Sequence, residues 1–207
     1  MAYNKLGHFT GVIGAMSTLI RTSQTHPLRI ATIPVGDRGG AVGVTFAPGK
    51  RHATAKTGVW QRDLAMDLEA IHQWGATDLI TLIEPHEFEE LAITQLPQKS
   101  AAIGLRWHGL PIADGAAPDS RFLDPWTSLG PDLARAIMEG SRVVVHCKGG
   151  LGRAGTVACL LLLSVGIAAT ADEAMNHVRG VRPGAIETHE QEDFLRAWTI
   201  PYGGSLV

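Results

Sequence analysis

Residues 143–153 read VVVHCKGGLGR, and this stretch decides the fold that we predict for the chain. Its unbroken run of valines is typical of a strand that is buried on both faces of a sheet. The strongly apolar residues 155–165 that follow predict a helix, so the glycine-rich part between them is a loop from a strand to a helix. Ligands of an α/β sheet bind at the carboxyl ends of its strands, which is where Cys147 falls.

The residues of this loop suit a phosphate group. Glycines let the backbone approach an anion closely, and the amides and dipole of the following helix add positive charge. Arg153 can donate to two phosphoryl oxygens at once, which a lysine cannot do in the same way. We therefore expect Arg153 to hold phosphate together with the backbone of Lys148, Gly149, Gly150, Leu151 and Gly152.

Cys147 lies inside that positive field, which favours its thiolate form. A thiolate that faces bound phosphate is set to attack phosphorus and to form a phosphocysteine. A lone cysteine after a strand is just as often a small core residue. The complete Cys-x5-Arg loop, in its strand–loop–helix context, favours the nucleophile.

The rest of the chain predicts strands that alternate with helices. Apolar and β-branched runs indicate strands at residues 26–35, 40–46, 79–83 and 103–108. Apolar spacing and end signals indicate helices at residues 60–74, 87–93, 123–139, 171–179 and 187–198. Such alternation predicts an α/β fold with a central, mostly parallel sheet flanked by helices. We expect one phosphatase domain at residues 26–200, between an N-terminal extension (1–25) and a C-terminal tail (201–207).

The composition argues against several classes of protein. With 45% apolar and 18% charged residues, the chain resembles an ordinary globular domain. A net charge of −2 gives no general attraction to nucleic acid or to an anionic membrane. The two cysteines argue against a secreted disulfide scaffold, and the apolar run 157–169 is shorter than the ~20 residues of a membrane span. We expect a cytoplasmic protein with no nucleic-acid partner and no membrane span.

The sequence predicts neither a metal nor a cofactor. The nine histidines are scattered, and there is no Cys-x-x-Cys pair. Residues 150–155 (GLGRAG) do match G-x-G-x-x-G, and Asp172 follows at the distance of a ribose-binding acid. However, the 52 residues after Gly155 are too few to complete a dinucleotide domain, and Asp172 looks like the start of a helix. A nucleotide-cofactor oxidoreductase is therefore the weakest alternative.

The loop resembles the His-Cys-x5-Arg signature of the protein tyrosine and dual-specificity phosphatases. The likeness extends to the kinase-associated phosphatase (cyclin-dependent kinase inhibitor 3) branch of that superfamily and its bacterial relatives. Three further segments resemble that branch: 43–50 (GVTFAPGK), 111–119 (PIADGAAPD) and 182–195 (RPGAIETHEQEDFL). Together with the loop they cover about residues 26–198, in the family's order.

The resemblance implies a two-step reaction with an aspartate as general acid and then general base. Asp114, 33 residues before Cys147, is the expected acid, and Asp119 is the reserve. The Asp114-Gly115 pair also suits an ordinary turn. The implied substrate is phosphotyrosine, phosphoserine or phosphothreonine in a protein, or a small phosphoester.

One position departs from the family pattern. The residue after the arginine is often Ser or Thr, whose hydroxyl stabilises the departing thiolate, and here it is Ala154. Thr156 either replaces that hydroxyl or bonds to its own helix backbone. Ala154 motivates the second alternative, a phosphopeptide-binding module with slow turnover.

Four further residues in or near the loop have an expected role or position. His146 is expected to support the loop through hydrogen bonds rather than to act as a base. Gln191, four residues from Glu187 and so on the same helical face, either orients water, as the resemblance implies, or has a surface role. Lys148 either adds charge at the pocket rim or is a solvated lysine. Cys159, on the apolar helix, is expected in the core.

Overall fold

A five-stranded sheet in the order β1-β2-β7-β5-β6 forms the centre of the structure, a computed structural model that describes residues 20–55 and 58–198. The strands are β1 (Ala31–Val35), β2 (Gly40–Phe46), β5 (Asp78–Thr81), β6 (Arg106–Gly109) and β7 (Arg142–Cys147). β1 runs antiparallel to β2, and the other neighbouring pairs are parallel. The predicted α/β fold with a central, mostly parallel sheet is therefore confirmed.

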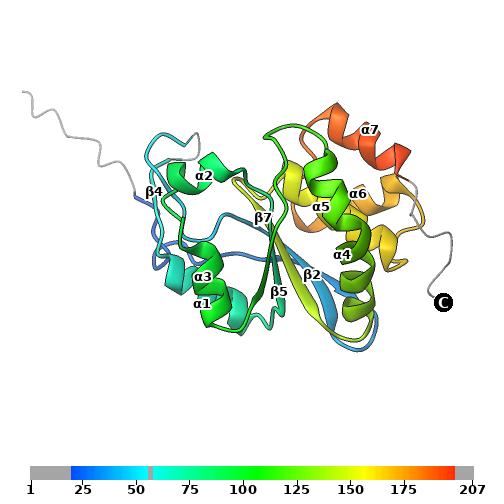
Figure 1. Ribbon diagram of the computed structural model, residues 1–207, viewed down its shortest axis with the longest axis horizontal. Coiled ribbons are helices and arrows are strands. Elements are labelled where there is room, and N and C mark those ends of the chain that lie inside the picture. The colour runs from blue at the N-terminus through cyan, green and yellow to red at the C-terminus, as the bar shows by residue number, and fades with distance from the viewer. Residues whose placement is uncertain (1–19, 56–57, 199–207) are drawn as a thin grey trace, which may run out of the picture.

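Helices cover both faces of this sheet (Figure 1). They are α1 (Leu64–Gln73), α2 (Pro85–Glu90), α3 (Leu96–Ala102), α4 (Ser120–Met138), α5 (Gly152–Ser164), α6 (Ala171–Val181) and α7 (His189–Ala197). Val143 and Val145 of β7 belong to the core under α4, α5 and α6, whereas Val144 belongs to the core under α1 and α3. β7 is thus buried on both faces, as its run of valines predicts.

The start of the first predicted helix was wrong. α1 begins at Leu64 because the side chain of Asp63 caps it and accepts a hydrogen bond from the Met66 amide at 2.9 Å. Trp60–Gln61 instead forms strand β4, which pairs with β3 (Arg51–His52). Strands of two residues show no periodicity, so the sequence could not reveal this hairpin.

Several other elements differ from expectation. Strands β1 and β6 begin at Ala31 and Arg106, later than the expected residues 26 and 103, and α2 begins at Pro85, two residues earlier than expected. Helix α3 was not predicted, since its sequence LPQKSAA has few apolar positions and buries only Leu96 and Ser100. Helix α4 begins at Ser120, three residues earlier than expected, because Asp119 caps it and accepts from the Arg121 amide at 3.0 Å. The ends of helices thus follow capping side chains more closely than apolar spacing.

The backbone of Arg21 pairs with Val59 and Gln61, which joins this part of the expected N-terminal extension to the β3–β4 hairpin. Residues 1–19 and 201–207 lie outside the described part of the chain, so the domain boundaries stay a prediction.

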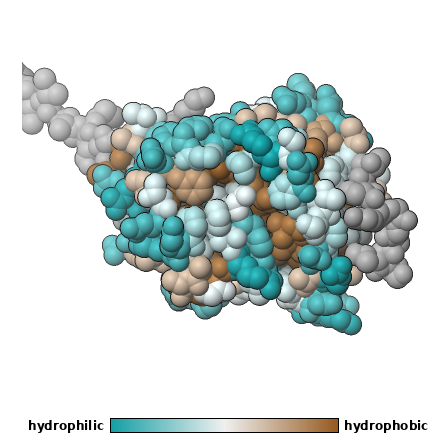
Figure 2. All heavy atoms as spheres, in the orientation of Figure 1, coloured by the Kyte–Doolittle hydropathy of each residue, from teal (hydrophilic) through white to brown (hydrophobic). Residues whose placement is uncertain are grey.

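Hydrophilic residues cover most of the periphery of the face in Figure 2, and hydrophobic residues gather towards its middle. Within residues 20–55 and 58–198, no helix has the length and apolar character needed to cross a membrane. The cytoplasmic location stays a prediction.

Candidate active site

The Cys-x5-Arg loop joins the central strand β7 to helix α5. Cys147 is the last residue of β7 and is 3% exposed. The amide of Gly150 donates to its sulfur at 3.2 Å, so the loop backbone already turns one N–H group towards the sulfur. Gly150 has a φ of +69°, and a Cβ there would lie 2.5 Å from the carbonyl of Thr45. Only glycine fits this position, and the loop can therefore pack directly against β2.

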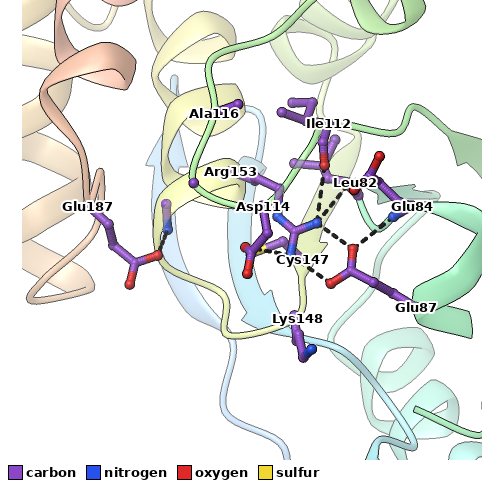
Figure 3. Close-up of polar contacts among 12 residues, drawn as sticks. Leu82, Glu84, Glu87, Ile112, Asp114, Ala116, Cys147, Lys148, Arg153 and Glu187 are labelled. Atoms are coloured by element: carbon purple, nitrogen blue, oxygen red, sulfur yellow. Dashed lines mark hydrogen bonds and ion pairs between the residues drawn. The ribbon is translucent and has the colours of Figure 1, made fainter. Parts of the chain in front are cut away.

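Arg153, in the first turn of α5, points back under the loop (Figure 3). Its Nη1 and Nη2 atoms donate to the two carboxylate oxygens of Glu87 at 2.6 and 3.0 Å. Nη1 also donates to the carbonyl of Ile112 at 3.1 Å, and Nη2 lies 2.8 Å from Oδ1 of Asp114. The guanidinium therefore connects the loop to α2 and to the segment that carries Asp114.

Glu87 and Arg153 form a buried ion pair, with side chains 2% and 1% exposed. Burial, the largest single influence, raises the pKa of Glu87, but the hydrogen bonds from Arg153 and the Glu84 amide, together with the charges of Arg153 and Lys148, outweigh it and hold that pKa below its usual value. Burial likewise disfavours the charged form of Arg153, but the bonds to Glu87 and the negative charges of Cys147, Glu87 and Asp114 together outweigh it and raise the pKa of the guanidinium. Both groups therefore stay charged, and the planar guanidinium is held in one orientation.

Glu87 is a residue of this site that sequence reasoning missed. Its segment was expected to be helical, and Glu87 does form a capping box with Glu84 at the start of α2. Nothing in a single sequence distinguishes a buried carboxylate there from the exposed Glu89 and Glu90 nearby.

Asp114 lies on the loop between β6 and α4, and its side chain is 71% exposed. Helix α7 and the residue before it hold that loop in place. Thr188 Oγ1 donates to the carbonyl of Gly115 at 3.0 Å, and Gln191 Nε2 donates to the carbonyl of Ala116 at 3.2 Å. The structure thus brings Asp114 to Arg153, whereas Asp119 caps α4 and pairs with Arg121 at 2.8 Å.

The other expected site residues have the following positions. Gln191 is buried and accepts from the amide of Glu187 at 3.0 Å, and Glu187 accepts from the Gly152 amide at 2.8 Å. Lys148 pairs with Glu90 at 2.5 Å. Thr156 Oγ1 donates to the carbonyl of Gly152 at 3.0 Å, which is a bond to its own helix backbone.

His146 is buried beneath the loop in a chain of hydrogen bonds. Trp107 Nε1 donates to Thr81 Oγ1 at 2.9 Å, so the hydroxyl of Thr81 has its own proton left to donate to His146 Nε2 at 2.8 Å. The proton of the neutral ring is then on Nδ1, 3.4 Å from the carbonyl of Cys147. Burial lowers the pKa of His146 to about 4, so the ring is neutral at pH 7 and supports the loop.

This burial predicts a pH dependence of stability. The unfolded chain protonates His146 near pH 6.5 and the folded chain only near pH 4, so stability is lost as the pH falls through this interval. We expect a loss of about 3 kcal/mol from this residue alone. Denaturant unfolding of wild type and His146→Gln between pH 7 and pH 4 measures it. Equal pH dependence in both proteins would contradict the neutral, buried ring.

Comparison with known proteins identifies the family. A family model described as "Swiss Army Knife protein, DSP-PTPase phosphatase domain" matches residues 61–195. Cyclin-dependent kinase inhibitor 3 of Mus musculus is 28% identical over 173 residues, which cover 82% of this chain and 77% of that protein. Protein tyrosine phosphatase domain-containing protein 1 of Bos taurus is 30% identical over 142 residues, which cover 64% of this chain and 17% of that protein.

Solved structures have the same fold. Kinase-associated phosphatase, crystallised with its catalytic-site cysteine replaced by serine, superposes with a TM-score of 0.70 at 24% identity, over 82% of this chain and 92% of that one. Tk-PTP in its active form gives a TM-score of 0.56 at 26% identity, over 77% and 91%. These matches leave the oxidoreductase alternative without support. The chain is similar to proteins of the kinase-associated phosphatase branch. It belongs to the DSP-PTPase family and is a protein tyrosine/dual-specificity phosphatase.

Proposed function

We propose that the protein hydrolyses phosphotyrosine, phosphoserine or phosphothreonine in proteins through a phosphocysteine at Cys147. The observation that carries this proposal is the position of Arg153. One buried guanidinium contacts both Glu87 and Asp114 and belongs to the same loop as Cys147. The residues to which we assign the roles of nucleophile, phosphate ligand and acid therefore lie close together, which supports the proposal.

The first step transfers the phosphoryl group to the enzyme. The sulfur of Cys147 attacks phosphorus, while Arg153 and the loop amides hold the phosphoryl oxygens. The bond from phosphorus to the leaving oxygen breaks, and Asp114 gives that oxygen its proton. In the second step Asp114 takes a proton from water, the water oxygen bonds to phosphorus, and the electron pair of the P–S bond returns to sulfur.

Hydrolysis of p-nitrophenyl phosphate tests the enzyme class. We expect activity that persists in EDTA and that vanadate inhibits, because neither step uses a metal. Activity that EDTA abolishes and divalent cations restore would contradict the proposal.

A second candidate, a phosphopeptide-binding module with slow turnover, rests on the lack of a free hydroxyl group at Ala154 and Thr156. Ala154 is buried and has no hydroxyl, and the hydroxyl of Thr156 is bonded to Gly152. Rapid mixing with p-nitrophenyl phosphate separates the candidates. A burst of one p-nitrophenol per enzyme followed by a very slow steady rate favours the binding module, whereas a fast steady rate favours the phosphatase.

Asp114→Asn tests the acid. We expect hydrolysis of phenyl phosphate, which has a poor leaving group, to slow by about 10²-fold or more, because the leaving oxygen then departs without a proton. Hydrolysis of p-nitrophenyl phosphate should slow much less. Asp119→Asn is the matched control, because Asp119 pairs with Arg121 rather than with Arg153, and it should keep both activities. Full activity of Asp114→Asn on phenyl phosphate would show that another group is the acid.

A further inference from the structure

The carbonyl groups of three consecutive loop residues accept hydrogen bonds from two cationic side chains. Nζ of Lys50 lies 3.4 Å from the carbonyl oxygen of Lys148. Nη2 and Nε of Arg182 lie 3.0 and 2.9 Å from the carbonyl oxygens of Gly149 and Gly150. Lys50 follows β2 and Arg182 follows α6, so cations from two separate segments hold the loop. We call Lys50 and Arg182 the carbonyl clamp.

One peptide group links the clamp to the nucleophile. Its carbonyl is that of Gly149, which accepts from Arg182, and its N–H is that of Gly150, which donates to the sulfur of Cys147. A peptide group whose oxygen binds a cation is polarised, so its N–H becomes a stronger donor. The charge of Arg182 therefore acts on the sulfur through a single peptide group.

Lys50 is a buried cation without a carboxylate partner in the described part of the chain. Its residue is 6% exposed, and its ammonium lies 5.1 Å from the centre of the Phe46 ring and 4.7 Å from that of Trp60. Arg62 packs against the same two rings, but its charge is balanced by Asp67 at 2.7 Å. The contrast between these two cations indicates that Lys50 has a different counter-charge.

The group placed to supply that counter-charge is the sulfur of Cys147, when it is ionised. Burial, aided by the cations Arg62, Lys148 and Arg182, lowers the pKa of Lys50 to about 8, and a negative Cys147 acts in the opposite direction. A buried charge with no opposite charge nearby is unfavourable, so a thiolate at Cys147 stabilises Lys50 and is stabilised by it.

The charged and titratable groups around Cys147 come from every segment that packs on the loop. The cations are Lys50, Lys148, Arg153 and Arg182, the carboxylates are Glu87, Glu90, Asp114 and Glu187, and His146 is neutral. Arg153 is paired with Glu87 and Asp114, and Lys148 is paired with Glu90. Lys50 and Arg182 are the two cations of this set that form no ion pair with a carboxylate of the described residues.

We propose that Lys50 and Arg182 are positioning residues that hold Cys147 as a thiolate and stabilise this thiolate when it leaves the phosphoenzyme. The inference rests on the proposed function. When water displaces the sulfur from phosphorus, the electron pair of the P–S bond returns to Cys147 as negative charge. Ala154 offers that charge no hydroxyl, and the clamp supplies positive charge through the loop backbone instead.

Alkylation by iodoacetamide tests the clamp without using hydrolysis, because only the thiolate reacts. The rate of modification at position 147 is followed by mass spectrometry from pH 5 to pH 9. We expect no alkylation of the second cysteine, because Cys159 is fully buried and burial raises its pKa to about 12. Cys147→Ser is the blank.

The substitutions separate charge from hydrogen bonding. We expect Lys50→Met and Arg182→Met each to slow alkylation at pH 6 about tenfold and to move the midpoint of the pH profile up by about one unit. Lys50→Gln keeps a donor without a charge and should behave like Lys50→Met. Lys50→Arg keeps the charge and should stay close to wild type. Lys99→Met and Arg135→Met remove exposed charges elsewhere and are the matched controls.

Two results would contradict the proposed role of the carbonyl clamp. Unchanged pH profiles in both methionine variants would remove any link between these cations and the thiolate, and a wild-type profile for Lys50→Gln would leave Lys50 only a hydrogen-bonding role. If Lys50→Met does not fold, the comparison of Lys50→Gln with Lys50→Arg still decides. The proposed function is tested by a different measurement. Phosphatase activity that persists in Cys147→Ser would contradict the proposed function, independently of the alkylation results.

Discussion

Replacement of Cys147 by serine is expected to remove phosphatase turnover while the loop still binds oxyanions. The serine hydroxyl is neutral at pH 7 and is a poor nucleophile without a base, and no step of the proposed reaction bypasses position 147. We expect kcat to fall by at least about 10⁴-fold, as in other enzymes that lose the nucleophile of covalent catalysis. Hydrolysis of p-nitrophenyl phosphate measures this loss.

Binding provides the second readout for this variant. Arg153 and the loop amides are unchanged in Cys147→Ser, so tungstate should still bind in calorimetry. Cys159→Ala is the matched control, since Cys159 lies in the core on α5, and its kcat should stay close to that of wild type. Turnover in Cys147→Ser would disprove the phosphocysteine, and loss of tungstate binding would indicate a collapsed loop instead.

The second large effect is expected for Glu87→Ala. This substitution leaves the charge of Arg153 buried without its bidentate partner, which costs about 3–5 kcal/mol of unfolding free energy. Because Arg153 then also loses its fixed orientation, we expect kcat/KM to fall by about 10²-fold. Urea unfolding and steady-state kinetics on p-nitrophenyl phosphate measure the two effects.

Asp67→Ala is the matched control for this prediction. Asp67 forms the other buried, bidentate pair of the described structure, with Arg62 at 2.7 and 2.8 Å. We expect a similar loss of stability there with a much smaller loss of activity. Since the pKa of Glu87 is lowered in the folded state, the stability that its pair contributes is present at neutral pH and disappears in acid, as the carboxylate becomes protonated. A Glu87→Ala protein within 1 kcal/mol of wild-type stability would contradict the buried pair.

The position of Asp114 on a loop could be predicted from the sequence, but the contacts that hold this loop could not. The segment 111–119 was recognised through its resemblance, and Asp114 was expected to be the acid. The sequence could not show that Thr188 and Gln191 hold this loop, because those contacts join residues 73 and 75 positions apart. Gln191 was expected to orient water or to have a surface role, and the structure places it against the Ala116 carbonyl.

Features that depend on short-range interactions could be predicted from the residues alone. The run Val143–Val145 is apolar on both sides, so it must lie in the middle of a sheet, and three glycines before Arg153 permit a loop that receives an anion. The expected nucleophile and phosphate-binding loop follow from about eleven consecutive residues, because their chemistry and their conformation are local, whereas the fold class follows from the alternation of strands and helices along the chain.

Only the tertiary structure decided which distant charges meet this loop. Glu87 lies 66 residues from Arg153, Lys50 lies 98 residues from Lys148, and Arg182 lies 32 residues from Gly150. The sequence around a charged residue is the same whether its side chain is solvated or buried. Burial depends instead on the order of the strands and on the helices that pack across them. These partners meet the loop because the segment after β2, the helix α2 and the end of α6 all come together where β7 ends, and this long-range geometry sets the electrostatics of the site.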